Sequence, residues 1–175
     1  MNNEQQAPGA TGTTPHKKRK ILFPGSFDPF TIGHQSLVSR GLAFADEILI
    51  AIGINEQKKG YFPVEERIAA IRALYENDPR VEVCTYDTLT VDLARQTGAN
   101  IILRGIRSVI DFEYEKNIAD VNRSISGIET IFLLAEPEHA HISSSVVREL
   151  LHFGKDVKMF IPPIIQDRLL NKKDI

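Results

Sequence analysis

The chain has 175 residues, 42% of them hydrophobic and 25% charged, which is typical of a single globular domain with a sizeable core. The formal net charge of -2 gives no bulk electrostatic case for a nucleic acid or an acidic membrane as partner. Because no apolar run could span a bilayer and the N-terminus lacks the apolar core of a signal peptide, we expect a cytoplasmic protein.

Residues 1–19 are polar and contain Gly, Pro and Thr, so we expect a flexible tail, followed by a single domain over residues 20–175. The expected strands cover residues 21–23, 47–54, 81–86, 100–105 and 129–135. The expected helices cover residues 33–45, 63–75, 89–96, 109–124, 143–152 and 162–170. Continuous apolar strands that alternate with helices predict an α/β, Rossmann-like fold, with a five-stranded parallel sheet and helices on both faces.

Ligands of such sheets bind beyond the carboxyl ends of the strands, so the residues after each strand are the first candidates for a site. After the first strand comes PGSFDPFTIGH, residues 24–34, in which Gly25 and Ser26 precede a helix that begins near His34. Unpaired main-chain N–H groups at that helix start favour an anion, to which the imidazole can donate. The alternative is an ordinary turn in which His34 has no task, and the composition of the loop alone favours this alternative.

Hydroxyl and cationic side chains also follow later strands. Lys58 follows the second strand and Thr90 the third, although a solvated lysine and a helix cap are the ordinary interpretations of these two. Ser143–Ser145 begin the helix after the fifth strand, where hydroxyls and main-chain N–H groups can cradle a phosphate, and Arg148 lies one turn further on. One of these serines needs no explanation beyond capping the helix.

Two arginines follow the fourth strand. Arg104 ends a buried strand, where an idle guanidinium is unexpected, and Arg107 follows three residues later. Guanidinium forks suit phosphate oxygens, and we favour that role for Arg104. The alternative is structural pairing with Asp111 or Glu115, which are spaced i, i+4 on the next helix.

Each of these features is ambiguous alone, but the strand ends converge on one edge of a parallel sheet. What converges there is cationic and rich in donors, which predicts a site for more than one phosphate. His139 and His141 are spaced like a metal pair, but no carboxylate or cysteine completes a zinc site, so we predict no metal ligand among the side chains.

Several motifs together carry a family resemblance. Residues 31–34, TIGH, resemble the (T/H)-x-G-H signature of the nucleotidyltransferase superfamily, and ISSSVVR at 142–148 resembles its second signature. With KK at 58–59, FPVEER at 62–67 and RGIRSVIDFEYE at 104–115, the chain resembles the bacterial phosphopantetheine adenylyltransferase family from about Lys20 to its C-terminus.

The resemblance implies transfer of the adenylyl group of ATP to 4'-phosphopantetheine, giving dephospho-coenzyme A and pyrophosphate, in coenzyme A biosynthesis. It also implies Mg²⁺ held through the ATP phosphates, a homo-hexamer, and dephospho-coenzyme A and coenzyme A as further ligands. Because the attacking phosphate is already ionised, no general base is needed, and we expect in-line displacement without a covalent enzyme intermediate.

The resemblance also assigns residues by position. It implies catalytic roles for His34, Lys58 and Arg107, and phosphopantetheine contacts from Ser26, Lys58, Thr90 and Arg104. It implies ATP contacts from Ser26, Phe27, His34, Gly105, Ile106, Arg107, Glu115, His139, Ala140, His141, Ile142, Ser143, Ser144 and Ser145. The chain departs from the family where His139 stands in place of a frequent aromatic residue and Thr90 in place of a frequent Met or Leu.

Three other functions remain open from the sequence. Adenylyl or cytidylyl transfer to another phosphate, such as nicotinate mononucleotide or glycerol phosphate, shares the (T/H)-x-G-H pattern. A non-catalytic module that senses ATP or coenzyme A is a second alternative, against which the intact His34, Lys58 and Arg104 argue. A dehydrogenase is disfavoured because the G-x-G-x-x-G loop is missing.

Overall fold

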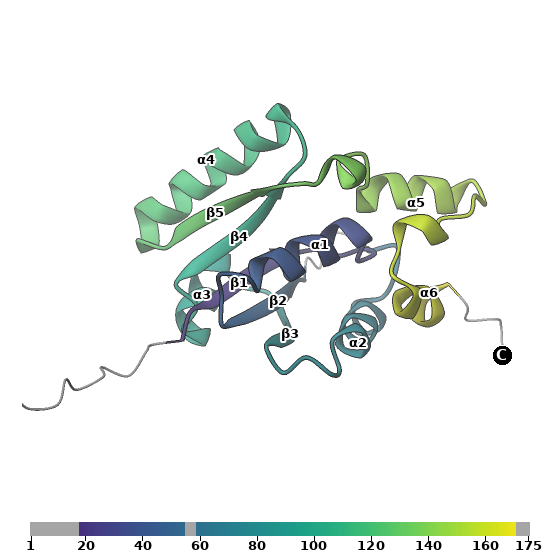
Figure 1. Ribbon diagram of the computed structural model, residues 1–175. Coiled ribbons are helices and arrows are strands. Elements are labelled where there is room, and N and C mark those ends of the chain that lie inside the picture. Colours follow the sequence, from purple (N-terminus) through teal and green to yellow (C-terminus); the bar gives the residue numbers. More distant parts are fainter. Residues whose placement is uncertain (1–17, 55–58, 171–175) are drawn as a thin grey trace, which may run out of the picture.

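The computed structural model describes residues 18–54 and 59–170, and it shows strands and helices in alternation (Figure 1). The strands are β1 (Lys20–Gly25), β2 (Glu47–Gly53), β3 (Val81–Tyr86), β4 (Ile101–Ile106) and β5 (Glu129–Leu134). The α-helices are α1 (Ile32–Gly41), α2 (Val64–Leu74), α3 (Thr90–Thr97), α4 (Val109–Ser126), α5 (Ser144–His152) and α6 (Pro163–Leu169). Two 3₁₀ turns, η1 (Pro137–His139) and η2 (Lys158–Phe160), complete these elements and were not predicted.

The five strands form one parallel sheet in the order β3-β2-β1-β4-β5, which confirms the predicted fold class. The chain first builds outward from β1 to β3 and then returns through α3 to β4 on the other side of β1. The strand order therefore reverses between β1 and β4. Ligands of doubly wound sheets bind at such a point, beyond the carboxyl ends of the strands.

Helices cover both faces of the sheet because the strands are apolar on both. On one face, Ile21, Phe23 and Ile50 belong to a buried cluster that includes residues from α1, α2, α5 and α6. On the other face, Leu22 and Leu49 pack with residues of α3. Continuous apolar runs in β1 and β2 are the physical reason why this sheet is a central layer.

Helix ends differ from prediction by up to four residues, with the largest difference at α1. That helix ends at Gly41, not at residue 45, because the N–H groups of Ala43 and Phe44 turn back to the carbonyls of Arg40 and Gly41. The turn is needed to bring the chain into β2, which begins at Glu47.

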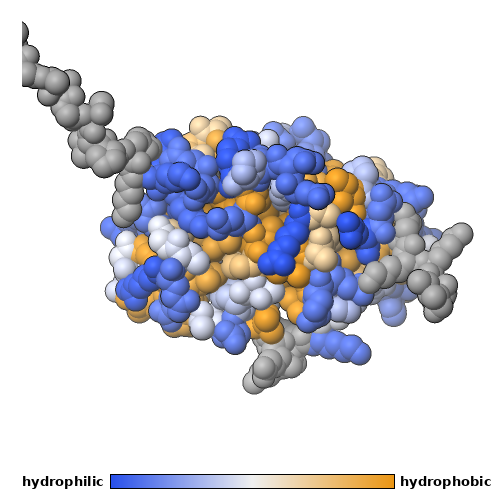
Figure 2. All heavy atoms as spheres, turned by 90° about the horizontal axis from the view of Figure 1, so that it is seen from below, coloured by the Kyte–Doolittle hydropathy of each residue, from blue (hydrophilic) through white to orange (hydrophobic). Residues whose placement is uncertain are grey.

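The predicted flexible tail falls mostly in residues 1–17, outside the described residues. Lys18 and Arg19, which we assigned to that tail, already make contacts, because Lys18 pairs with Glu47 and the Arg19 N–H donates to Asp46. None of the helices in the described residues is long and apolar enough to cross a membrane. From below, hydrophobic side chains gather in the middle of the surface between hydrophilic ones (Figure 2).

Candidate active site

Two adjoining cavities open where the strand order reverses. The first has a volume of about 280 Å³ and the second about 520 Å³. They share one wall, made by the end of β1 and the end of β4; its residues are Pro24, Gly25, Ser26 and Arg104. Ser26 is exposed, whereas the next residue, Phe27, is only 2% exposed. Because Ser26 lines both cavities, it lies at the boundary between them.

The first cavity brings together the ends of β1, β4 and β5, three of the five strand ends that were expected to converge. It is lined by residues from β1 and its loop, the start of α1, the end of β4, the segment after β5 and the start of α5. These residues are Phe23, Pro24, Gly25, Ser26, Phe27, Thr31, Gly33, His34, Leu37, Arg104, Gly105, Arg107, Ala135, His139, Ile142, Ser143, Ser144, Ser145 and Arg148. Three of them are arginines and none is acidic, so this cavity suits an anion.

His34 sits at the start of α1, and its ring is fixed by the residue that caps the helix. The backbone N–H of Thr31 donates to Nδ1 of His34 over 3.0 Å, while the Thr31 hydroxyl accepts from the His34 N–H. Because Nδ1 accepts, the ring proton lies on Nε2. Burial, reinforced by the positive charges of Arg107 and Arg104, lowers the pKa of His34 to about 3, so the ring is a neutral donor at neutral pH.

Aromatic side chains hold the His34 ring on its other sides. The ring centroids of Phe27, Phe30 and Phe23 lie 5.1, 5.3 and 6.2 Å from that of His34. Phe27 has a φ of 46°, in the left-handed region that side chains other than glycine rarely adopt. Strain of this kind persists only where the surroundings enforce it, so the loop after β1 is held by strong contacts.

Arg104 combines the two interpretations that the sequence left open. Its Nε and Nη2 donate to the Glu115 carboxylate at 2.7 and 2.5 Å, and its Nη1 donates to the Pro24 carbonyl at 2.6 Å. Three of five guanidinium N–H groups are thus used for orientation, and two remain. The structural pairing is present, and the same arginine still lines both cavities.

Arg107 behaves in the same way. Its Nε and Nη2 donate to Asp111 at 2.8 and 3.1 Å, and its side chain stays 40% exposed at the edge of the first cavity. Both arginines are therefore oriented by acids of α4, four to eleven residues further along the chain. Such pairs position a guanidinium while leaving donors for an anion.

The start of α5 also faces the first cavity, although its three serines differ in what they offer. Ser143 caps the helix by accepting from the Val146 N–H, and Ser145 accepts from Nη2 of Arg148. Ser144 donates its hydroxyl proton to the Pro29 carbonyl at 2.8 Å. The Ser144 hydroxyl therefore ties α5 to the loop after β1.

The second cavity lies on the α3 and α4 side of the shared wall. Its walls include Tyr86 at the end of β3, Thr90 at the start of α3, and Tyr114 and Glu115 of α4. The hydroxyls of Tyr86 and Thr90 lie 3.1 Å apart, so the Thr90 side chain has a polar partner within the cavity wall. This cavity mixes apolar and polar groups, as pockets for small organic molecules do.

Close packing within the protein disfavours a side chain at two glycines that line the first cavity. A Cβ on Gly25 would lie 2.9 Å from the ring of Phe27, and one on Gly105 would lie 2.4 Å from Leu37. Gly33 has room for a methyl group, since its nearest neighbour would be the Thr31 hydroxyl at 3.6 Å. Packing within the protein therefore does not explain why residue 33 is a glycine.

Not every predicted residue lines the first cavity. Lys58 lies outside the described residues, and Thr90 and Glu115 line the second cavity. Ile106 is 4% exposed in the core, while Ala140 and His141 lie between η1 and α5, with the His141 ring 6.1 Å from that of Phe160. His139 does line the first cavity, and its Nδ1 lies 3.3 Å from the Glu136 carboxylate.

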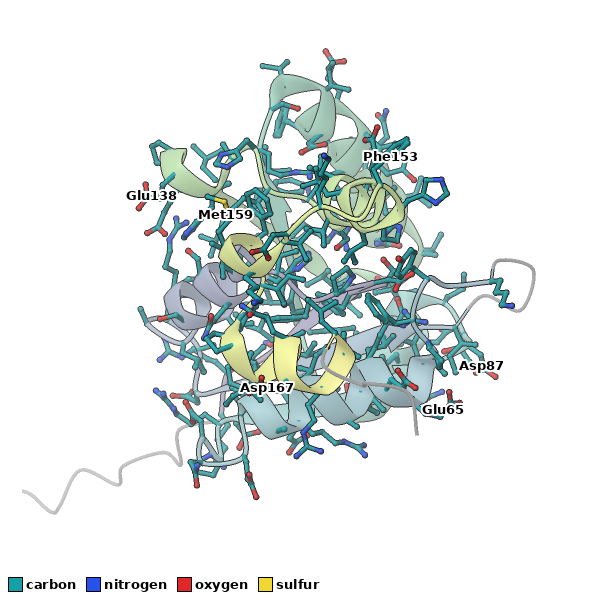
Figure 3. All side chains as sticks on the ribbon, turned by 90° about the vertical axis from the view of Figure 1, so that its right-hand side faces the viewer. Glu65, Asp87, Glu138, Phe153, Met159 and Asp167 are labelled. Atoms are coloured by element: carbon teal, nitrogen blue, oxygen red, sulfur yellow. The ribbon has the colours of Figure 1, made fainter. Side chains whose placement is uncertain are left out.

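Some acidic side chains lie on the surface and line neither cavity. Figure 3 labels Glu65, Asp87 and Glu138 at its outer edge, and all three are exposed. Within residues 18–54 and 59–170, no cluster of three or more His, Cys, Asp or Glu side chains could hold a metal ion.

Sequence reasoning missed the aromatic part of the second cavity and the polar contacts that brace the first. Tyr86 is the last residue of β3 and could have been found by the same strand-end rule. Tyr114 and Ile118 are spaced i, i+4 on α4, a pattern that marks one helix face but gives no hint of a cavity. Arg67 stands in the FPVEER motif, but no sequence signal indicated that it is buried on α2 and bound to the Ser26 carbonyl.

A family model and several named proteins match most of this chain. Residues 22–150 match the model of the cytidylyltransferase-like family. This chain is also similar to proteins named phosphopantetheine adenylyltransferase. Over 144 residues it is 58% identical to the one from Bacteroides fragilis, 59% to the one from Bacteroides thetaiotaomicron and 60% to the one from Phocaeicola vulgatus. These matches cover 82% of this chain and 96%, 95% and 95% of the relatives.

A solved structure supports the fold independently. A crystal structure assigned as nicotinate-nucleotide adenylyltransferase from Vibrio parahaemolyticus superposes with a TM-score of 0.60, at 19% identity. The match covers 86% of this chain and 97% of that one. At this identity the likeness concerns the fold alone.

Proposed function

Because this chain belongs to the cytidylyltransferase-like family and, within it, to the phosphopantetheine adenylyltransferases, we propose that it joins the adenylyl group of ATP to 4'-phosphopantetheine. The products are dephospho-coenzyme A and pyrophosphate. The chain is thus a nucleotidyltransferase of coenzyme A biosynthesis.

The observation that best supports this function is the wall that the two cavities share. A reaction between two phosphates needs two sites that meet at the reacting atoms. Ser26 and Arg104 lie in that wall, with the donor-rich first cavity on one side and the partly apolar second cavity on the other. ATP fits the first by its charge, and an acceptor with an organic arm fits the second.

The reaction then follows from positioning and charge. A phosphate oxygen of phosphopantetheine attacks the α-phosphorus of ATP, a new P–O bond forms, and the bond from the α-phosphorus to the oxygen of the leaving pyrophosphate breaks. The attacking oxygen is already ionised, so no side chain needs to take its proton. We infer a direct in-line displacement without a covalent enzyme intermediate.

In this proposal His34 donates from Nε2 to the α-phosphate, where charge develops in the transition state. Arg104 holds the acceptor phosphate at the shared wall, and Arg107 and the start of α5 hold the remaining phosphates of ATP. His139 is proposed to contact the nucleotide at the far wall of the first cavity. Lys58 keeps its predicted role at the reacting phosphates.

Magnesium is proposed to arrive with ATP. The lining of the first cavity, as far as the structure describes it, offers N–H and O–H donors and no carboxylate, so this donor set fits a metal that is held by the phosphates themselves. Bound there, Mg²⁺ would neutralise charge on the triphosphate and the leaving pyrophosphate.

Turnover with purified protein tests the proposed function. Pyrophosphate release is measured with ATP and phosphopantetheine, and with a panel in which CTP replaces ATP and nicotinate mononucleotide or glycerol phosphate replaces the acceptor. We expect release only with ATP and phosphopantetheine. Binding of ATP and coenzyme A without pyrophosphate release would instead favour a sensor module.

We further propose a cytoplasmic homo-oligomer, a hexamer by family resemblance. Helix α4 supports assembly, because it has 18 residues and none of them is buried. Its apolar side chains Val109, Ile110, Val121 and Ile125 are 54% to 80% exposed. A face of this size with apolar character is typical of contact between copies.

A further inference from the structure

Two buried charged residues, Asp28 and Arg67, hold the loop that carries Ser26, and the sequence motifs in which they stand assign no substrate contact to either. Asp28 is 6% exposed and Arg67 is 8% exposed. Charged side chains are almost never this buried unless their polar atoms are used, so each requires an explanation.

Asp28 binds the chain that follows β2. Its Oδ2 accepts from the Tyr61 N–H at 2.7 Å, and its Oδ1 accepts from the Phe62 N–H at 3.0 Å. These donors lie 33 and 34 residues away in the sequence. Both carboxylate oxygens therefore serve to attach one strand-end loop to another.

Arg67 closes the same connection from α2. Its Nη1 donates to the Ser26 carbonyl at 2.5 Å, and its Nε donates to the Phe62 carbonyl at 3.0 Å. Between the two residues there is little free space, because a Cβ on Gly60 would lie 3.2 Å from both Arg67 Nη2 and Asp28 Oδ2. The clamp, meaning Asp28, Arg67 and the backbone of Tyr61–Phe62, is therefore closely packed.

The clamp acts on the backbone at which the two cavities meet. Ser26 and Phe27 lie between its two charged residues, and Phe27 is the residue with a φ of 46°. Arg148 holds the opposite side of the loop by donating to the Asp28 carbonyl at 2.7 Å. Such an arrangement supplies the over-determined surroundings that a strained residue needs.

We propose that Asp28 and Arg67 are positioning residues for adenylyl transfer, which fix the Ser26–Phe27 backbone, and the Phe27 ring against His34, in the reactive geometry. This inference rests on the proposed function. Neither side chain is assigned to the substrates; each acts through the backbone that it holds. A small displacement of reacting groups by a change outside the reacting centre can slow turnover about 10²-fold.

The test uses Asp28→Asn and Arg67→Lys. Asparagine replaces one acceptor oxygen by an NH₂ group that faces a backbone N–H, and lysine cannot span two carbonyls as a guanidinium does. We expect kcat to fall about 10²-fold in Asp28→Asn and less in Arg67→Lys. Dissociation constants for ATP and for phosphopantetheine, measured by calorimetry, should stay within a few-fold.

Matched controls separate positioning from stability. Arg72 lies on the same helix and donates Nε and Nη2 to the Val83 carbonyl, and Asp78 accepts from the Arg80 N–H, both away from the two cavities. Arg72→Lys and Asp78→Asn should keep kcat near that of the unmodified chain, even where they lower Tm as much as the clamp variants do.

The outcomes can be told apart. If the unmodified chain turns over and both clamp variants keep its kcat, the clamp is only structural and the inference is overturned. If Asp28→Asn is too unstable to assay, Arg67→Lys decides, because it keeps the charge. If the unmodified chain itself releases no pyrophosphate, the proposed function fails, and the inference fails with it for that separate reason.

Discussion

The backbone N–H of Thr31 donates to Nδ1 of His34 over 3.0 Å, and this contact decides which ring nitrogen can act on a substrate. With Nδ1 occupied, Nε2 carries the proton and is the donor of a ring that lines the first cavity. The residue that caps α1 thereby also sets the tautomer of the proposed catalytic side chain.

Replacement of His34 by alanine should lower kcat by roughly 10²–10³-fold, because one preorganised donor to the transition state is lost. Circular dichroism should show the fold intact. His34→Gln should retain more activity than His34→Ala, since its amide N–H can reach a similar position. His152→Ala, at the exposed end of α5, is the matched control, and a near-normal kcat in His34→Ala would contradict the assigned role.

His34 should also make the folded state less stable in acid. Its pKa is lowered from 6.5 to about 3 on folding, so between these values the unfolded chain binds a proton that the folded chain does not. Stability from this group is complete above pH 6.5 and falls as the pH drops toward 3, by at most about 1.4 kcal/mol per pH unit. Urea unfolding measures this effect. Between pH 7 and pH 4 the free energy of unfolding should fall less in His34→Gln than in the unmodified chain, and an equal fall in both would contradict the prediction.

Arg104→Ala should weaken phosphopantetheine binding more than ATP binding, because Arg104 lines the second cavity beside Thr90. It should also lower the free energy of unfolding by roughly 1–3 kcal/mol, since Glu115 loses its partner. The double change Arg104→Ala with Glu115→Gln should recover part of that stability but not the acceptor affinity. Arg95→Ala is the control, and unchanged affinity in Arg104→Ala by calorimetry would count against its role.

Gly33→Ala should fold normally or gain about 0.5–1 kcal/mol of stability, because a methyl group fits the protein there and α1 favours alanine over glycine. If ATP phosphates approach the start of α1 closely, the same methyl group should raise KM for ATP. The measurement is KM for both substrates, with Ser39→Ala on the exposed side of α1 as control. An unchanged KM for ATP would place the phosphates elsewhere.

Ile125→Glu should break the proposed assembly into smaller species, because it places a charge in the apolar face of α4. Ser124→Glu adds the same charge at the neighbouring exposed position and should leave the assembly unchanged. Light scattering coupled to gel filtration reports the mass. A monomeric unmodified chain would overturn the proposed homo-oligomer.

The sequence by itself determined the sheet and the identity of most residues around the first cavity. Apolar runs such as that of β2 can only be buried on both faces, and parallel strands bring their carboxyl ends to one edge. Ser26, His34, Arg104 and Ser143 could therefore be predicted to meet, because each stands next to a recognisable strand end or helix start.

Only the tertiary structure decided which side chains touch. Periodicity reports which face of an element is buried, but it carries no information on a partner many residues away. The pairing of Arg104 with Glu115 was one of two open alternatives, and the contact of Arg67 with the Ser26 carbonyl joins residues 41 positions apart. Such contacts depend on the packing of separate elements, and they fix the geometry on which the proposed chemistry depends.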